Sequence, residues 1–247
     1  MSDSNPFDPP PTSSLLSNAC GPRKVSLAPI ALYKRSYALM GEQYWLFVGI
    51  TLVGILLGSL VPFGILMGPM MVGIYLCFAD RERGKQVEFG TLFKGFDHFA
   101  NSFIAVLIIM VVSFLVMIPI LIVMTVVILT VLQSDGGNQV SPLVFPVLLL
   151  SYLVILIAIF LIQLPFLFTF QLIADRGLTG PQAVGMSFKA LQKNFGGCIF
   201  LSIVIGLLSI LASLACYVPV FFLMPITMGV LFLAYRDIFG PTSPSSS

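Results

Sequence analysis

Residues 61–81 read VPFGILMGPMMVGIYLCFADR, and residues 218–237 read VPVFFLMPITMGVLFLAYRD. With one gap, both stretches share a Val-Pro start, a Leu, a Pro, a Gly and a final pair of Asp and Arg. Neither stretch carries a charge before that final pair. Since a helix rises ~1.5 Å per residue, about 20 apolar residues cross the ~30 Å of hydrocarbon in a bilayer. Each stretch therefore predicts a membrane span that is entered through a tight Val-Pro turn.

The composition of the whole chain supports a membrane environment. Of its 247 residues, 58% are hydrophobic and 9% are charged, and the mean hydropathy is +1.05. Soluble domains carry about 25% charged residues. Because so few charges cannot coat a surface that faces water, most of the chain is expected to face lipid. The formal net charge of +2 and the lack of basic runs interleaved with aromatic residues argue against a nucleic-acid partner.

Four long uncharged stretches define the predicted spans. They are Tyr44–Ala79, Phe103–Gln133, Leu143–Ala174 and Phe195–Tyr235. The first and the last would each exceed ~50 Å as single helices, and each has a Pro or Gly break near its middle. We therefore expect two tight hairpins, with spans near residues 45–60 and 64–79 and near residues 198–215 and 219–235.

The two middle stretches are separated by the polar turn SDGGNQVSP at residues 134–142. Each stretch would be ~45 Å or longer as a single helix. We therefore expect these segments to be tilted, kinked at Pro119 and Pro165, or partly outside the hydrocarbon. The total is six spans. Splitting the middle segments to give eight spans is the alternative, and it leaves both termini on the same side.

The positive charges predict the orientation in the membrane. All 12 Lys and Arg residues fall on one side of the six-span arrangement, in the N-terminal region, the loops at 80–102 and 175–197, and the C-terminal tail. The sole charge on the other side is Asp135. Because positively charged loops stay in the cytosol, both termini are expected to be cytosolic. The polar tails at residues 1–27 and 240–247 are expected to be disordered.

The membrane domain, residues 28–239, reads as three repeats of one unit, at 28–80, 87–175 and 180–237. Each unit begins with an amphipathic segment in which an aromatic residue precedes a lysine. Such a segment lies in the headgroup layer with its lysine reaching water, and a two-span hairpin follows it. The predicted fold is thus an all-α polytopic membrane bundle of six transmembrane helices in parallel repeats. The candidate interfacial basic residues are Lys34, Lys94, Lys189 and Lys193.

Glycine and proline residues mark the predicted turns and the predicted close contacts between helices. Small residues four positions apart let two helices approach closely, either within one chain or between chains. The residues assigned to turns and packing are Gly54, Gly58, Pro62, Gly64, Gly68, Pro69, Gly73, Pro219, Pro225 and Gly229.

The predicted spans contain no Asp, Glu, Lys, Arg or His. Proton relays and ion pathways depend on ionisable groups inside the membrane, so a proton-coupled pump is not expected. The single histidine, His98, follows Asp97, but adjacent helix positions do not face each other, and we interpret it as a juxtamembrane residue. Neither a catalytic motif nor a metal-binding cysteine spacing is present. The chain is therefore expected to be no enzyme and to hold no metal or cofactor.

Three polar residues inside the middle spans, Thr125, Ser151 and Gln163, are candidates for lining a polar cavity near Pro165. A glutamine in lipid is costly unless it is hydrogen-bonded. The alternative is that these side chains bond neighbouring helices and line no cavity.

The segments GPMMVGIYLCFADRERG (68–84), FGTLFKGFDHF (89–99) and GPQAVGMSFKALQKNFGG (180–197) resemble a broad group of bacterial six-span integral membrane proteins. The group includes domain of unknown function 975, the YciC-like proteins and the membrane domain attached to some glycerophosphodiester phosphodiesterases. The resemblance covers about residues 28–238. It implies a six-span fold in the bacterial inner membrane and no catalytic residues. The tripeptide at residues 5–7, Asn-Pro-Phe, is similar to the adaptor-binding motif of secretory carrier membrane proteins, whose four-span pattern this chain does not follow.

Two functions are expected from these features. The first is a membrane scaffold or partner-binding component without catalytic activity, which acts through helix packing and the cytosolic amphipathic segments. Its partners would be the lipid bilayer, other membrane proteins or a second copy of the chain. The alternative is a transporter, channel or lipid-handling protein for an uncharged or apolar substrate, suggested by the polar residues and prolines of the middle spans.

Overall fold

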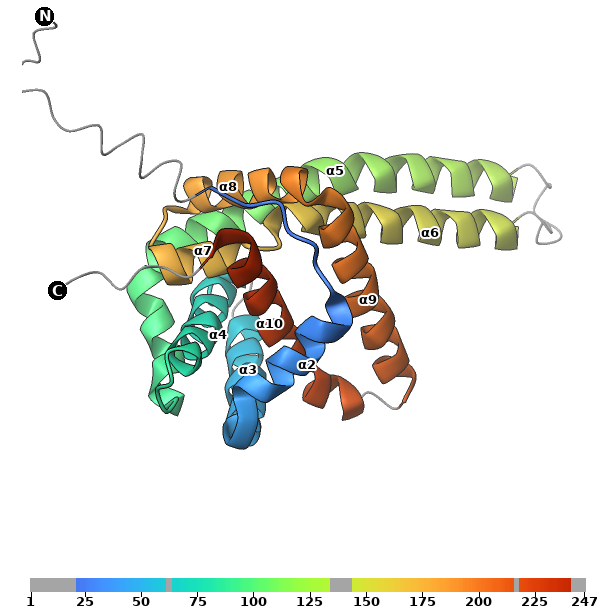
Figure 1. Cartoon of the computed structure of the whole chain (residues 1–247). Coiled ribbons are helices and arrows are strands. Elements are labelled where there is room, and N and C mark those ends of the chain that lie inside the picture. Colours follow the sequence, from blue (N-terminus) through green and yellow to red (C-terminus); the bar gives the residue numbers. More distant parts are fainter. Residues whose placement is uncertain (1–20, 61–63, 134–143, 216–217, 241–247) are drawn as a thin grey trace, which may run out of the picture.

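The computed structural model is a bundle of helices, and it describes residues 21–60, 64–133, 144–215 and 218–240 (Figure 1). In this part of the chain every regular element is helical. The α-helices are α2 (Pro29–Met40), α3 (Tyr44–Leu60), α4 (Met67–Glu82), α5 (Phe99–Gln133), α6 (Val144–Gln163), α7 (Thr169–Arg176), α8 (Gly180–Lys193), α9 (Phe195–Leu214) and α10 (Val218–Phe239). The 3₁₀ helices are η1 (Gly41–Gln43), η3 (Phe89–His98) and η4 (Leu164–Phe166). The predicted all-α fold class is confirmed.

Five described segments are long and apolar enough to cross a membrane, as expected of a multi-pass membrane protein. They are Pro29–Leu60, Phe89–Thr130, Phe145–Arg176, Phe195–Leu214 and Val218–Phe239. Helix α4 has 16 residues and is shorter than any of them. The count of six spans therefore stays a prediction.

Helix α4 is the centre of the bundle and packs against α3, η3, α5, α7 and α10. Two glycines allow the backbone of η3 to lie directly on it. A Cβ on Gly73 would collide with the carbonyl oxygen of Leu92, and a Cβ on Gly95 would collide with the carbonyl oxygen of Pro69. Because only hydrogen fits between these backbones, both positions need glycine for packing.

The two middle segments differ in what happens at their prolines. Helix α5 runs for 35 residues without a break at Pro119, which lies inside it. At ~1.5 Å per residue it is about 50 Å long, more than the ~30 Å hydrocarbon thickness. Helix α6 ends at Gln163, and Pro165 lies in η4 immediately after it. Figure 1 shows α5 and α6 side by side as a hairpin that extends away from the other helices.

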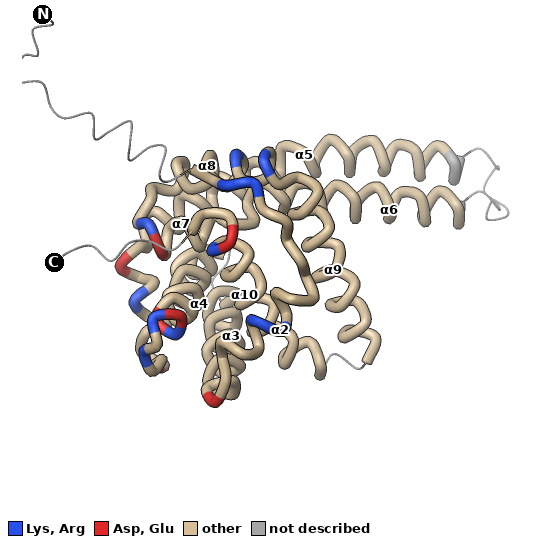
Figure 2. The backbone as a smooth tube through the Cα atoms, viewed as in Figure 1, with Lys and Arg blue, Asp and Glu red and all other residues tan. Residues whose placement is uncertain are grey.

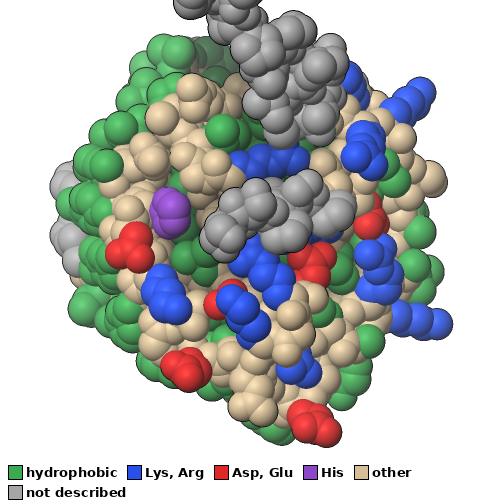
Figure 3. Space-filling view, turned by 60° about the vertical axis from the view of Figure 1, so that its left-hand side comes forward, with side chains coloured by type: hydrophobic (Ala, Val, Ile, Leu, Met, Phe, Trp, Pro, Cys, Tyr) green, Lys and Arg blue, Asp and Glu red, His purple; other side chains and the backbone are tan. Residues whose placement is uncertain are grey.

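Charged side chains gather on one part of the molecule. In Figure 2 they lie on α2, α4 and α8 and near the C-terminal ends of α7 and α10, whereas the described part of the α5–α6 hairpin carries none. Figure 3 shows the face on which Lys, Arg, Asp and Glu are grouped. This segregation in space matches the segregation along the sequence.

The segments predicted to open the three units are α2, η3 and α8. Each precedes a pair of long helices, although the second is a 3₁₀ helix. Pro62 lies outside the described residues. Pro219 is the second residue of α10. The repeat itself stays a prediction.

Ordered structure begins before residue 28, the boundary expected from the sequence. The backbone N–H of Arg23 donates to the carbonyl oxygen of Ile238 at 2.8 Å. The buried amide of Asn194 accepts from the N–H of Val25 and donates to the carbonyl oxygen of Arg23, both at 2.8 Å. Residues 23–25 are therefore held against the junction of α8 and α9, because one amide satisfies two backbone groups. The expected disorder of residues 1–20 lies outside the described part of the chain.

Candidate functional site

Two adjacent cavities lie where α6 ends. The first, of about 360 Å³, is lined by α4, α5, α10 and the α6–η4–α7 segment. The second, of about 340 Å³, is lined by α6, η4, α9 and α10. Gln163, Leu167 and Leu231 line both cavities and form a waist between them. We call the two cavities and their waist the crevice.

The crevice follows from how α6 ends and what α6 contacts. Proline has no backbone N–H and disfavours a helical conformation in the residue before it. The chain accordingly leaves the α-helix at Gln163 and enters η4 with Pro165. Helix α6 packs closely along α5 but only loosely against α9 and α10. The space beside the end of α6 therefore stays open.

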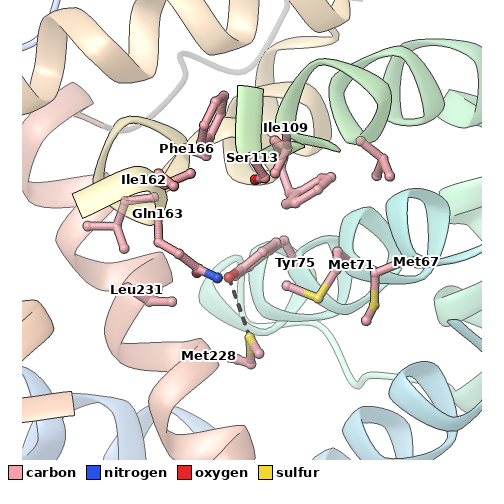
Figure 4. A pocket seen from close by; sticks show the side chains of 13 residues that line it. Met67, Met71, Tyr75, Ile109, Ser113, Ile162, Gln163, Phe166, Met228 and Leu231 are labelled. Atoms are coloured by element: carbon pink, nitrogen blue, oxygen red, sulfur yellow. Dashed lines mark hydrogen bonds between the residues drawn. The ribbon is translucent and has the colours of Figure 1, made fainter. Parts of the chain in front are cut away.

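The first cavity is apolar except for three hydrogen-bonding side chains, those of Tyr75, Ser113 and Gln163. Figure 4 shows Tyr75 and Gln163 directed toward each other from α4 and from the end of α6. Three methionines, Met67, Met71 and Met228, form much of the remaining lining that Figure 4 labels. Tyr75 and Met228 lie near the middles of α4 and α10, whereas Met67 is the first residue of α4.

The hydroxyl of Tyr75 lies within hydrogen-bonding distance of Met228, which also lines the cavity, and of Gln171, which does not. It lies 3.5 Å from Sδ of Met228. The side-chain amide of the buried Gln171 is satisfied when its oxygen accepts from Tyr75 at 3.1 Å and its nitrogen donates to the carbonyl oxygens of Leu167 and Phe168 at 3.3 Å. The hydroxyl proton of Tyr75 is donated to these groups, and the Tyr75 oxygen can still accept a hydrogen bond from another group.

Gln163 and the serines of the crevice have no such partners. In the described part of the chain, the side chains of Gln163 and Ser113 make no hydrogen bond. The hydroxyl of Ser202, which lines the second cavity, is buried and has no partner among the described residues. Each unsatisfied polar group in an apolar environment costs about 1–3 kcal/mol. The crevice thus offers hydrogen-bonding groups to a bound molecule.

The crevice opens sideways through the surface of the bundle. Gln163 is exposed, and so are the apolar side chains of Leu156, Ile159 and Leu161 on the same helix. Such a surface faces lipid in a membrane protein. No charged side chain lines either cavity. A molecule entering from the bilayer would therefore meet an apolar, uncharged path.

Of the three residues predicted to line a polar cavity, only Gln163 lies in the crevice. The hydroxyl of Thr125 donates to the carbonyl oxygen of Leu121, and that of Ser151 to the carbonyl oxygen of Val147, each at 2.7 Å. Both residues lie on the hairpin and line neither cavity. Sequence reasoning did not assign Tyr75, Ser113 or Ser202 to a cavity, because no spacing along the chain relates them to Gln163.

The residues predicted for packing lie mostly at close contacts between helices. An added Cβ would lie 3.0 Å from Cδ1 of Ile74 at Gly54, 3.1 Å from Cα of Met67 at Gly58 and 2.8 Å from the carbonyl oxygen of Ser102 at Gly68. At Gly229 it would collide with the hydroxyl of Ser36. Pro69 and Pro225 are buried in α4 and α10, and Gly64 has a positive φ of 62° before α4.

A buried ion network joins the C-terminal ends of α4, α7 and α10. The guanidinium of Arg236 donates to Glu82 at 2.6 Å and to Asp175 at 2.8 Å, and the hydroxyl of Tyr235 donates to Asp175 at 2.8 Å. The side chains of Arg236 and Asp175 are 6% and 1% exposed. We call these four residues the clasp. The same three helices line the first cavity, so the clasp fixes its walls relative to one another.

The predicted interfacial lysines remain on the surface. Lys34, Lys94 and Lys189 are exposed, and Lys193 donates to the carbonyl oxygen of Pro22 at 3.2 Å. His98 lies in η3 beside Asp97, on the charged face and away from the crevice. Within the described residues no group of three or more metal-ligating side chains is formed.

Comparisons with known proteins leave the family open. No protein-family model matches the chain, and no curated protein or solved structure is significantly similar to it. The resemblance to bacterial six-span proteins therefore stays a prediction.

Proposed function

We propose that this integral membrane protein binds an uncharged lipid in the crevice. The observation that carries the proposal is the exposed amide of Gln163, which has no hydrogen-bond partner among the described residues, at the waist of two apolar cavities. The volumes fall near the lower end of the ~300–1,000 Å³ typical of small-molecule sites. This is the lipid-handling alternative among the functions expected from the sequence.

The lining favours a neutral ligand with a hydroxyl or a carbonyl group. A charged group buried among apolar side chains would lack a partner of opposite charge, which is costly. Gln163 and Ser113 can each donate or accept a hydrogen bond, and the Tyr75 oxygen can accept one. Flexible methionines such as Met71 adapt to ligands of varied shape. The ligand would enter from the bilayer and exclude water as it binds.

A scaffold role is the second candidate, and the surface of η3 favours it. Phe89, Phe93 and Phe96 of η3 and Phe99 at the start of α5 are 37–43% exposed, close in sequence to Lys94. A row of aromatic side chains next to a lysine suits insertion into the headgroup layer. The glycine contacts with α4 hold η3 rigidly, so the row is presented in a fixed orientation.

We further propose that the charged face lies in the cytosol, with both termini on that side, in a bacterial inner membrane. The segregation of all Lys and Arg residues supports the orientation, and the resemblance supports the location. Modification of Lys85→Cys by an impermeant maleimide from the cytosolic side only is the expected result.

Lipid that co-purifies with the protein tests the lipid-binding function. The protein is extracted in a mild detergent, and bound neutral lipids are quantified by mass spectrometry for wild type, Gln163→Leu and Tyr75→Phe. Since a hydrogen bond contributes about 1 kcal/mol net, each variant is expected to retain about 5-fold less lipid.

Thr125→Val is the matched control, because it removes a polar group of the hairpin outside the crevice and is expected to retain lipid fully. A wild-type protein free of neutral lipid, or equal retention in Gln163→Leu and wild type, would contradict the proposed function.

A further inference from the structure

We infer that the crevice holds one neutral lipid with two acyl chains, of the diacylglycerol class, with its polar centre at the waist and one chain in each cavity. This inference rests on the proposed function and specifies its ligand. It also assigns Ser202 and Gly206 of α9, two small residues whose spacing in the sequence is typical of helix packing, to the binding site.

The sizes and linings of the two cavities favour a ligand with two apolar arms. The two volumes, about 360 and 340 Å³, are nearly equal. Away from the waist, the second cavity is lined by Leu156, Ile159, Phe160 and Ile205, together with Gly206. Two similar apolar spaces joined at one point match a molecule with two similar apolar arms joined at one centre.

The polar groups around the waist favour a ligand whose polar centre lies between its two chains. A single long chain threaded through both cavities would place methylene groups against the Gln163 amide and leave it unsatisfied, at a cost in free energy. A glycerol centre at the waist would instead present ester carbonyls and a hydroxyl to this amide. Ser113 and Tyr75 lie on one side of the waist and Ser202 on the other, so polar partners flank the centre on both sides.

The hydroxyl of Ser202 is a candidate partner for a carbonyl group of the lipid. Ser151 of α6 and Ser213 of α9 each bond to the carbonyl oxygen four residues earlier. The Ser202 hydroxyl makes no such bond within the described chain, although it is buried. A buried hydroxyl is rarely left without a partner. A lipid carbonyl in the second cavity would supply one.

Gly206 makes the inference testable, because it lines the second cavity and has no heavy atom within 4 Å of an added Cβ. Gly206→Leu therefore places a side chain in that cavity without a collision at the backbone. Gly196→Leu is the matched control, since Gly196 lies in the same helix, has equally open surroundings and lines neither cavity.

The experiment measures binding of dioleoylglycerol and of monooleoylglycerol to the full-length protein in nanodiscs, by native mass spectrometry. Wild type is expected to bind one dioleoylglycerol and to prefer it over monooleoylglycerol. Gly206→Leu should weaken dioleoylglycerol binding by at least ~10-fold and leave monooleoylglycerol in the first cavity. Ser202→Ala should weaken dioleoylglycerol alone, by about 5-fold, as expected for one lost hydrogen bond.

Two independent single-chain sites would overturn the inference. They would give two bound monooleoylglycerol molecules in wild type and one in Gly206→Leu, with no preference for the two-chain lipid. That result would leave the proposed function standing. Binding of neither lipid by wild type would overturn both. Equal loss in Gly196→Leu and Gly206→Leu would assign the effect to α9 as a whole and contradict the inference.

Discussion

At the scale of single residues, the hydrogen bonds of a polar side chain in a span decide whether it is available to a ligand. The hydroxyls of Thr125 and Ser151 donate hydrogen bonds to carbonyl oxygens of their own helices, whereas the hydroxyl of Ser202 has no partner in the described chain. These residues have similar chemistry in sequence. The difference arises because the hydroxyls of Thr125 and Ser151 bond the backbone of their own helices, while Ser202 lines the second cavity.

Glycines show the same dependence on surroundings, and they give a prediction. In η3, Gly95 faces the backbone of α4, whereas Gly90 has open surroundings. Gly95→Ala should destabilise the protein by about 1–3 kcal/mol, because a methyl group would overpack two backbones. Thermal unfolding in detergent, followed through the fluorescence of Trp45, measures the effect.

Gly90→Ala is the control from the same segment, and its unfolding temperature should remain close to that of wild type. Equal midpoints for Gly95→Ala and Gly90→Ala would refute the close approach of η3 to α4.

At the scale of elements, the expected interfacial segments and the expected spans differ in the side chains that they expose. The phenylalanines of η3 are exposed, and the same segment carries the exposed Lys94 and Asp97. Helix α9 carries no charge, and its exposed side chains, such as Leu207, are apolar. The two elements should therefore contact the bilayer at different depths.

Tryptophan fluorescence tests these depths. In a Trp45→Phe background, Phe93→Trp should be quenched most by lipids brominated near the headgroup. Leu207→Trp in the same background is the control, and lipids brominated near the end of the chain should quench it most. The same depth profile for both would remove the support for η3 as a headgroup-layer segment and for the scaffold candidate.

At the scale of the whole molecule, the clasp joins parts of the chain that are far apart in sequence. Glu82, Asp175 and Arg236 come from three different helices, and each lies next to the charged end of a predicted unit. In the sequence, the corresponding Asp and Arg residues look like borders between spans and loops. The bundle turns some of them inward, where they bond one another.

The clasp predicts a large difference between two arginines. Arg236→Met removes the guanidinium that bonds the buried carboxylate of Asp175 and also Glu82, so it should destabilise the protein by about 3–5 kcal/mol. Arg35→Met breaks the pair with Asp237, in which the arginine side chain is 51% exposed, and surface pairs contribute at most about 1 kcal/mol.

Unfolding midpoints of both variants in the same detergent provide the measurement. A loss of stability in Arg236→Met no greater than that in Arg35→Met would show that the clasp does not hold the three helix ends together.

The sequence by itself determined the environment and the class of fold. Uncharged stretches too long and too apolar for water, with basic residues confined to the segments between them, predict a helical membrane protein, because backbone groups in lipid must bond within their own helix. The Val-Pro stretch 61–81 predicted a helix, and α4 begins within it at Met67. Gln163 was singled out for the same reason, since an amide in lipid requires a partner.

Only the tertiary structure decided where the crevice lies and what lines it. Tyr75, Ser113 and Ser202 belong to three different helices, and no spacing along the chain brings them to Gln163. The continuity of α5 through Pro119 and the end of α6 before Pro165 were equally undecided, because neighbouring helices determine whether a proline bends or ends a helix. Close packing between distant segments fixes the cavities and the clasp, and although glycine spacing indicated several packing positions, only the fold decides which backbone each glycine meets.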